Sequence, residues 1–172
     1  EKPDRGNIVV QKAVPIKPND TARTLFNRIT KAAVPALERF LELARQGRLE
    51  GKPQDQAKAS YFGGRKPEDG RIDWSTGAAQ VYNLVRAVAH PYPGAFTVYR
   101  GKKIFIWWGR PVSGTVQALP GTVVKIDRRG VTVATGKGMF LIQKMQVEGG
   151  TEKDAVAACI DESIGCGALL GS

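Results

Sequence analysis

Residues 95–108 read AFTVY, then RGK, then KIFIWW. Both flanks are rich in β-branched and aromatic residues, and the Arg-Gly-Lys between them is a turn signal. The pattern therefore predicts a β-hairpin of strands 95–99 and 103–108. Three further β-rich runs follow, separated by glycine-containing turns, at 121–126, 130–134 and 139–147. Short strands at this spacing are typical of a small closed barrel.

On both sides of this β-rich region, the sequence predicts helices. Residues 75–89 predict a helix capped by Ser75, with apolar residues along one side. The Pro-Tyr-Pro-Gly stretch at 91–94 then ends it in a rigid turn. After the last strand, residues 151–160 predict a short helix capped by Thr151. Residues 165–172 are interpreted as a tail.

The first third of the chain has a different pattern. Residues 7–16, NIVVQKAVPI, predict a strand, and apolar residues recur at helical spacing over 25–44. Pro35 should kink or divide that helix, and Gly47 should end it. One strand and one long helix cannot bury each other, so this part is interpreted as the edge of an α/β layer. The predicted fold class is thus α/β plus β.

Composition narrows the function classes. No apolar run approaches the roughly 20 residues of a membrane-spanning helix, so we expect a soluble protein without membrane insertion. The net charge is +10, and the excess of Lys and Arg lies before residue 113. Such a balance permits binding to phosphates, nucleic acid or another anion. The spacing of Cys159 and Cys166 fits no common zinc motif, and with His90 as the single histidine we expect no metal site.

Two stretches carry a specific resemblance. The first is PDRGNIV at 3–9, and the second is GRKPEDGRIDWS at 64–75, which continues into NLVRAV at 83–88 and PYPGAF at 91–96. In this order and at this separation they resemble the C-terminal half of the 10-formyltetrahydrofolate-dependent formyltransferases. The resemblance implies the C-terminal portion of a Rossmann-like catalytic domain over 1–65, a linker with a helix over 66–94, and an OB-like domain over 95–172.

The resemblance also implies a catalytic residue. In this family an Asp-x-Gly-x-Ile/Val motif carries the catalytic aspartate, which is Asp4 here. The aspartate orients a histidine and raises its pKa, and an asparagine helps to stabilise the oxyanion that forms when an amine attacks the formyl carbon. The family's asparagine and histidine lie before residue 1, so we expect the isolated chain to be inactive. Glu1, Lys2 and Pro3 are expected to contact the 10-formyltetrahydrofolate together with Asp4.

The stretches at 61–65, 82–88, 91–92 and 147–150 are more similar to the UDP-4-amino-4-deoxy-L-arabinose formyltransferases than to the enzymes that formylate methionyl-tRNA. This resemblance implies transfer of a formyl group to the 4-amine of the sugar, in lipid A modification and antibiotic resistance. It also implies a cytoplasmic enzyme that is fused to, or associated with, a decarboxylating dehydrogenase domain. A pyrophosphate favours guanidinium partners, and a ring favours aromatic ones. The predicted substrate-binding residues are Arg65, Arg71, Arg86, Trp74 and Tyr92.

Two alternatives remain open. A methionyl-tRNA formyltransferase would use the barrel as a nucleic-acid surface, through residues such as Arg100, Lys103, Trp107 and Arg110. Residues 113–172 carry as many acidic as basic side chains, which argues against a polyanion as partner. The other alternative is a non-catalytic docking or oligomerisation module, and assembly into homo-oligomers is compatible with each of these functions.

Overall fold

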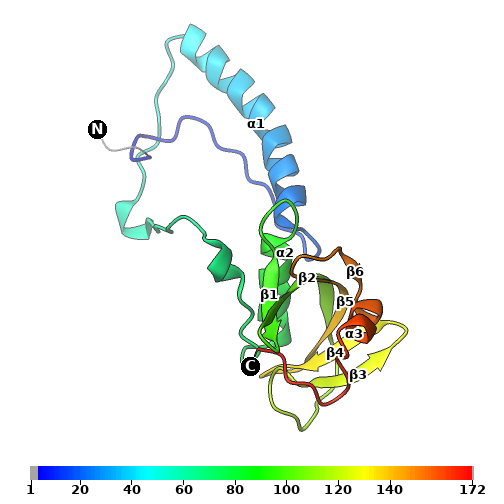
Figure 1. Ribbon diagram of the computed structural model, residues 1–172. Helices are drawn as coiled ribbons and strands as arrows, with labels where there is room; N and C mark the ends of the chain where they lie inside the picture. Colours follow the sequence, from blue (N-terminus) through cyan, green and yellow to red (C-terminus); the bar gives the residue numbers. More distant parts are fainter. Residues whose placement is uncertain (1–3, 172) are drawn as a thin grey trace. The chain divides into compact units, whose positions relative to one another are not determined.

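The computed structural model describes residues 4–171 and divides the chain into two compact units, residues 1–64 and 65–172 (Figure 1). In unit 1 the main element is helix α1 (Ala22–Arg45), followed by a 3₁₀ turn, η1 (Gln56–Lys58). Unit 2 holds the strands and the remaining helices. No helix within residues 4–171 combines the length and apolarity that crossing a bilayer requires.

Helix α1 begins at a threonine cap and ends before a glycine. Thr21 precedes it, and Thr21 and Thr24 each accept the other's backbone N–H through the side-chain oxygen, at 3.3 and 2.9 Å. Gly47, with φ of 67°, follows the helix, as predicted. Of the two outcomes expected at Pro35, a kink or a division, the division does not occur, because α1 continues through Pro35 as one element. Proline removes a single N–H donor, and the exposed surroundings let water solvate the carbonyl left without a partner.

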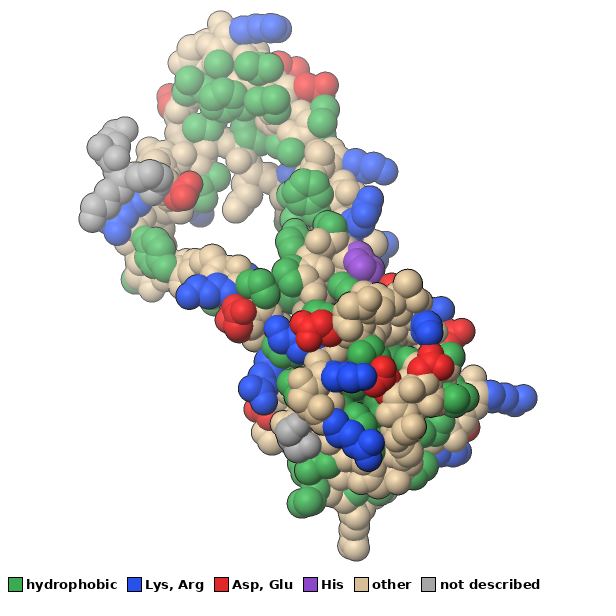
Figure 2. Space-filling view, viewed as in Figure 1, with side chains coloured by type: hydrophobic (Ala, Val, Ile, Leu, Met, Phe, Trp, Pro, Cys, Tyr) green, Lys and Arg blue, Asp and Glu red, His purple; other side chains and the backbone are tan. Residues whose placement is uncertain are grey.

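The predicted strand at 7–16 does not form. Ile8 makes one antiparallel bridge with Lys52, through two N–H···O bonds of 2.9 Å, and the remainder of this range lies outside any strand. A strand needs a neighbouring strand along its length, and unit 1 has none among its described residues. The α/β layer of the predicted Rossmann-like portion is therefore absent from this part of the chain. The apolar face of α1 stays exposed instead: none of its residues is buried, and Phe26 is 61% exposed (Figure 2).

Unit 2 is built on one antiparallel sheet with strand order β1-β2-β5-β4-β3, and β6 pairs with β5. The strands predicted in unit 2 all form: β1, β4 and β5 have the expected bounds, and β2 is four residues longer at its C-terminal end than expected. Their bounds are β1 Ala95–Tyr99, β2 Lys102–Val112, β3 Val123–Asp127, β4 Gly130–Ala134, β5 Met139–Val147 and β6 Lys153–Asp154.

Two helices cover the sheet. Helix α2 (Ala78–Val88) packs against β1, β2 and β5, with Val81, Val85 and Val88 in the core. Helix α3 (Ala155–Asp161) packs against β4, β5 and β6. Between them lies a core of aliphatic side chains, Phe140 and Trp74.

Both predicted helix starts are wrong. Gly77, rather than Ser75, precedes α2, and the Gln80 side chain accepts the Gly77 N–H at 2.8 Å. The Ser75 hydroxyl donates to Asp73. Thr151 does not cap α3, because residues 153–154 pair with β5 before the helix begins.

The predicted closed barrel is also wrong, because β1 and β3 do not pair within the described residues. The segment 167–171, interpreted above as a tail, bonds to both of these edges. Val123 donates to Ala168 O at 2.8 Å on the β3 side, and Gly171 donates to Val98 O at 2.7 Å on the β1 side. Leu170 points its side chain into the core. A segment of irregular backbone thus satisfies edge groups that a closing strand pair would otherwise satisfy.

We expect Leu170→Ala to lower the free energy of unfolding by about 2–5 kcal/mol, because it removes a buried side chain and leaves a cavity. Leu169→Ala, at a more exposed neighbour, is the matched control and should cost clearly less. Urea denaturation followed by circular dichroism measures both. Equal losses would mean that residues 167–171 do not contribute to the core.

Candidate functional site

Asp4 lies on a turn with an uncommon backbone. Its φ is 62°, in the left-handed region that a non-glycine residue seldom adopts and that asparagine and aspartate tolerate best. The Gln54 side chain holds this turn by donating to Asp4 O at 2.9 Å and to Gly6 O at 2.8 Å. The Ile8–Lys52 bridge joins the same two segments, residues 4–8 and 52–54, two residues further along each of them. The Asp4 side chain itself is exposed.

The side chain of Gln54 thus holds the backbone of this turn, while the Asp4 carboxylate faces solvent. A residue kept in a sparsely populated backbone region by neighbouring contacts is often a functional one. The other predicted folate contacts, Glu1, Lys2 and Pro3, lie outside the described residues.

In unit 2 a cavity of about 630 Å³ lies where the segment before α2 meets the C-terminal segment. Two of the predicted substrate residues, Arg71 and Trp74, line it. Hydrogen bonds between backbone groups fix both borders: Ile72 donates to Phe96 O at 2.8 Å, and Leu170 donates to Gly121 O at 2.9 Å.

The chemical character of this cavity is mixed. Arg71 is exposed and available to an anionic group. Asp73 also lines the cavity, and hydrogen bonds from the Ser75 hydroxyl and backbone N–H, at 2.6 and 2.9 Å, hold the pKa of its carboxyl below its usual value. Trp74 is 4% exposed and donates its indole N–H to Thr97 Oγ1 at 3.0 Å, so only an edge of the ring can meet a ligand.

The structure does not bring the other three predicted substrate residues into this cavity. Its described lining excludes Arg65, Arg86 and Tyr92. The Arg86 guanidinium donates to Asn83 Oδ1 at 2.9 and 3.0 Å and lies over the Tyr82 ring, 5.7 Å from its centroid. Arg65 and Tyr92 are exposed.

An aromatic cluster that the sequence did not reveal connects the end of α2 to the sheet. His90 stacks on Trp107 with ring centroids 3.7 Å apart, and its Nε2 lies 3.1 Å from Glu152 Oε2. Trp107 also donates to Gln146 Oε1 at 2.8 Å. Trp108 meets the Tyr82 ring edge-on at 6.1 Å. Both tryptophan rings are thus engaged with protein side chains, which is a structural role.

Neither cysteine belongs to a metal site in the part of the chain that is described, where no group of three or more His, Cys, Asp or Glu side chains could hold an ion. Cys159 is buried in the core and Cys166 is exposed, and both are free thiols. Burial, with a smaller contribution from Cys166, raises the pKa of the Cys159 thiol to about 11.

The comparisons with known proteins cover different parts of the chain: the family model matches within unit 2, and the solved structures match across both units. A family model described as the formyl transferase C-terminal domain matches residues 65–159. Among solved structures, HypX from Aquifex aeolicus in complex with tetrahydrofolic acid is similar to this chain with a TM-score of 0.69 at 21% identity, over 96% of this chain. A double variant of the same HypX gives a TM-score of 0.67, also at 21% identity and over 96% of this chain. Both matches cover 29% of the HypX chain, so this chain spans less than a third of that protein. At this identity the likeness shows the fold.

We expect a thiol reagent at pH 8 to modify Cys166 quickly and Cys159 slowly in the folded chain. A raised pKa keeps the Cys159 thiol protonated at this pH, and only the thiolate reacts. Ellman's reagent, with and without urea, measures the two phases: one fast thiol when folded, two when unfolded. Cys166→Ser should remove the fast phase, and a fast phase that survives this substitution would contradict the assignment.

Proposed function

The chain belongs to the formyl transferase C-terminal domain family, and on that premise we propose that it is the C-terminal part of an enzyme that formylates a sugar nucleotide. The formyl donor is 10-formyltetrahydrofolate, and the acceptor is the 4-amine of UDP-4-amino-4-deoxy-L-arabinose. The match over residues 65–159 supports formyl transfer, and the sequence resemblance supports the sugar nucleotide as acceptor. We assign the reaction to the cytoplasm and to lipid A modification, with a dehydrogenase domain as the expected fusion or partner, because the sequence resemblance implies them.

The folate assignment has one further support. HypX, whose fold is similar over 96% of this chain, is known in complex with tetrahydrofolic acid. In our proposal the segment Glu1–Asp4 contributes to the folate site of the complete enzyme. The turn held by Gln54 would fix the backbone from which Asp4 projects.

Asp4 is the chain's own contribution to the chemistry. An exposed carboxylate on a fixed turn can accept a hydrogen bond from a histidine of the complete enzyme and favour its charged form, which raises the histidine pKa. The imidazolium, together with an asparagine, then stabilises the negative charge on the formyl oxygen as the amine attacks. His90 is not that histidine in our proposal, because its ring is stacked on Trp107 and its Nε2 meets Glu152.

For the sugar nucleotide, Arg71 is the favoured partner. It lines a cavity of about 630 Å³, within the range of small-molecule sites, and a guanidinium can bind a diphosphate through two parallel hydrogen bonds. Arg86 is less available, because Asn83 and Tyr82 occupy its guanidinium. Arg65 and Tyr92 remain candidates on exposure alone.

The structure offers less support for methionyl-tRNA as the acceptor. Stacking on unpaired bases needs aromatic faces that are free, and Trp107 and Trp108 both pack against protein rings. Lys102, one of the cations near these strands, is paired with Glu162 at 2.9 Å. We therefore rank the sugar nucleotide first.

We expect Asp4→Asn, made in the full-length protein, to abolish formyl transfer while leaving the fold intact. The amide cannot stabilise a neighbouring imidazolium, so the oxyanion loses its charged partner. Tetrahydrofolate release in the presence of 10-formyltetrahydrofolate and the UDP-amino sugar measures turnover. Glu50→Gln removes an exposed charge from the same unit and should leave turnover unchanged. Near-normal turnover by the Asp4 variant would remove Asp4 from the mechanism.

We expect Arg71→Lys to raise the KM for the UDP-amino sugar by about tenfold, because lysine replaces a bidentate fork with a single point charge. The KM for 10-formyltetrahydrofolate should not change. Arg128→Lys is the control at an exposed arginine of the same unit. Offering methionyl-tRNA separately decides the acceptor: turnover with the tRNA alone would overturn the sugar-nucleotide assignment and keep the formyl-transfer chemistry.

A further inference from the structure

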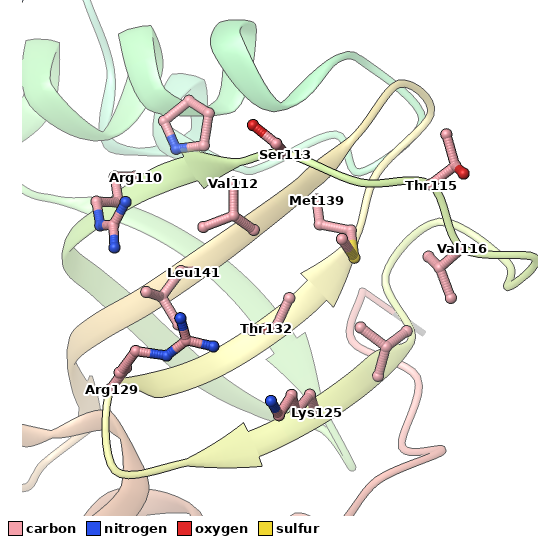
Figure 3. A pocket seen from close by; sticks show the side chains of 12 residues that line it. Arg110, Val112, Ser113, Thr115, Val116, Lys125, Arg129, Thr132, Met139 and Leu141 are labelled. Carbon is pink, nitrogen blue, oxygen red and sulfur yellow. The ribbon is translucent and has the colours of Figure 1, made fainter.

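A second cavity, of about 530 Å³, lies on one face of the sheet in unit 2 (Figure 3). Strand register explains its floor. Arg110 on β2 is opposite Leu141 on β5, Leu141 is opposite Thr132 on β4, and Thr132 is opposite Lys125 on β3. Residues directly opposite in a sheet share a face, so these four side chains form one row across four strands. The row spans three strand spacings, roughly 14 Å.

The two ends of this row are positively charged. Arg110 stands at one end and Lys125 at the other, and Arg129 joins them from the turn between β3 and β4. Figure 3 shows the guanidinium groups of Arg110 and Arg129 on either side of Leu141. The described lining contains no carboxylate.

Among residues 4–171, Asp127 is the one acidic side chain paired with these cations. Asp127 pairs with both Lys125 and Arg129, each at 3.1 Å, and the hydrogen bonds from Arg129 hold the pKa of its carboxyl far below the usual range. Arg110 has no ion-pair partner between residues 4 and 171. The three cations and the one carboxylate give the cavity a net charge of two positive units. The Arg110 guanidinium is available to a ligand.

The floor between the charges is aliphatic with a few hydroxyl groups. Leu141 and Thr132 lie in the middle of the row and are 2% and 9% exposed, so neighbouring side chains cover most of both. The remaining described lining is aliphatic, thioether or hydroxyl in character, and includes no aromatic ring. A nucleobase would therefore lack a stacking partner, whereas an alkyl chain would gain contacts.

From this arrangement we propose that the cavity binds a small organic anion with a phosphate or carboxylate head and an aliphatic body. The head group accepts hydrogen bonds from Arg110, and Lys125 and Arg129 add to the positive field. The body lies over Leu141, Val116 and Met139. None of these residues belongs to the proposed formyl-transfer site, so the ligand is a second one, independent of that function.

The test is isothermal titration of the chain with octyl phosphate and with octanoate, which separate the two head groups. We expect saturable binding of at least one of them, weakened by added salt because the head group is held by charge. Inorganic phosphate and octyl glucoside, which carry only the head or only the chain, should bind much more weakly. Equal binding of octyl glucoside, or tighter binding of UDP, would overturn the proposal.

Two matched pairs of variants locate the site. Arg110→Gln should weaken binding by about tenfold or more, as expected for a charge-assisted hydrogen bond, and Arg128→Gln, at an exposed arginine outside the lining, should not. Val116→Glu brings a like charge into the cavity and should weaken binding, whereas Gln117→Glu adds the same charge on the same loop outside the lining. Equal effects within either pair would place the ligand elsewhere, such as on the exposed apolar face of α1, and overturn the proposal.

Discussion

The pairing of β2 with β5 is the interaction on which the rest of unit 2 depends. These are the two longest strands, and their ladder runs from Ile104 opposite Val147 to Val112 opposite Met139. Each strand then carries a neighbour on its other edge. The close approach requires glycine at Gly109, where a Cβ would lie 2.6 Å from Leu141 O and 2.5 Å from the nearest atom of the Phe140 ring. Since side chains alternate between the two faces, this one register decides which residues form the core and which line the cavity beside Arg110.

The cavities beside Arg110 and beside Arg71 arise in different ways from that sheet. In the first, strand register places Arg110 and Lys125 at fixed positions of the ladder, and Arg129 follows on the turn after β3. The one beside Arg71 lies between two irregular segments, 71–75 and 169–171, each held by a few backbone hydrogen bonds. Irregular segments can rearrange at a lower cost in free energy than a sheet can, which suits a site that closes on a substrate.

Sequence patterns predicted the elements of unit 2 well, because each strand there satisfies its pattern locally. Residues 95–99, 130–134 and 139–147 form strands at the predicted bounds, and the predicted hairpin forms with a two-residue turn, Arg100-Gly101, in which both residues have a positive φ. The pattern at 7–16 failed for the opposite reason: its residues favour a strand, but no neighbour in unit 1 pairs with them beyond Ile8. The role of residues 167–171 was not predictable, because an irregular segment that bonds two sheet edges has no periodicity to detect.

The same distinction applies to the candidate sites. A motif pointed to Asp4, but only the structure shows that Gln54, fifty residues away, holds its turn. Their charge and residue type made Arg71 and Arg86 equal candidates for substrate binding. The structure distinguishes them, because Arg71 lines a cavity whereas the Arg86 guanidinium is hydrogen-bonded to Asn83. In the nucleic-acid alternative, Arg110 and the two tryptophans belong to one basic and aromatic face of the barrel. In the fold those rings pack against His90 and Tyr82, and Arg110 stands instead beside an aliphatic floor. What a basic residue binds is therefore decided by the side chains that the register places next to it.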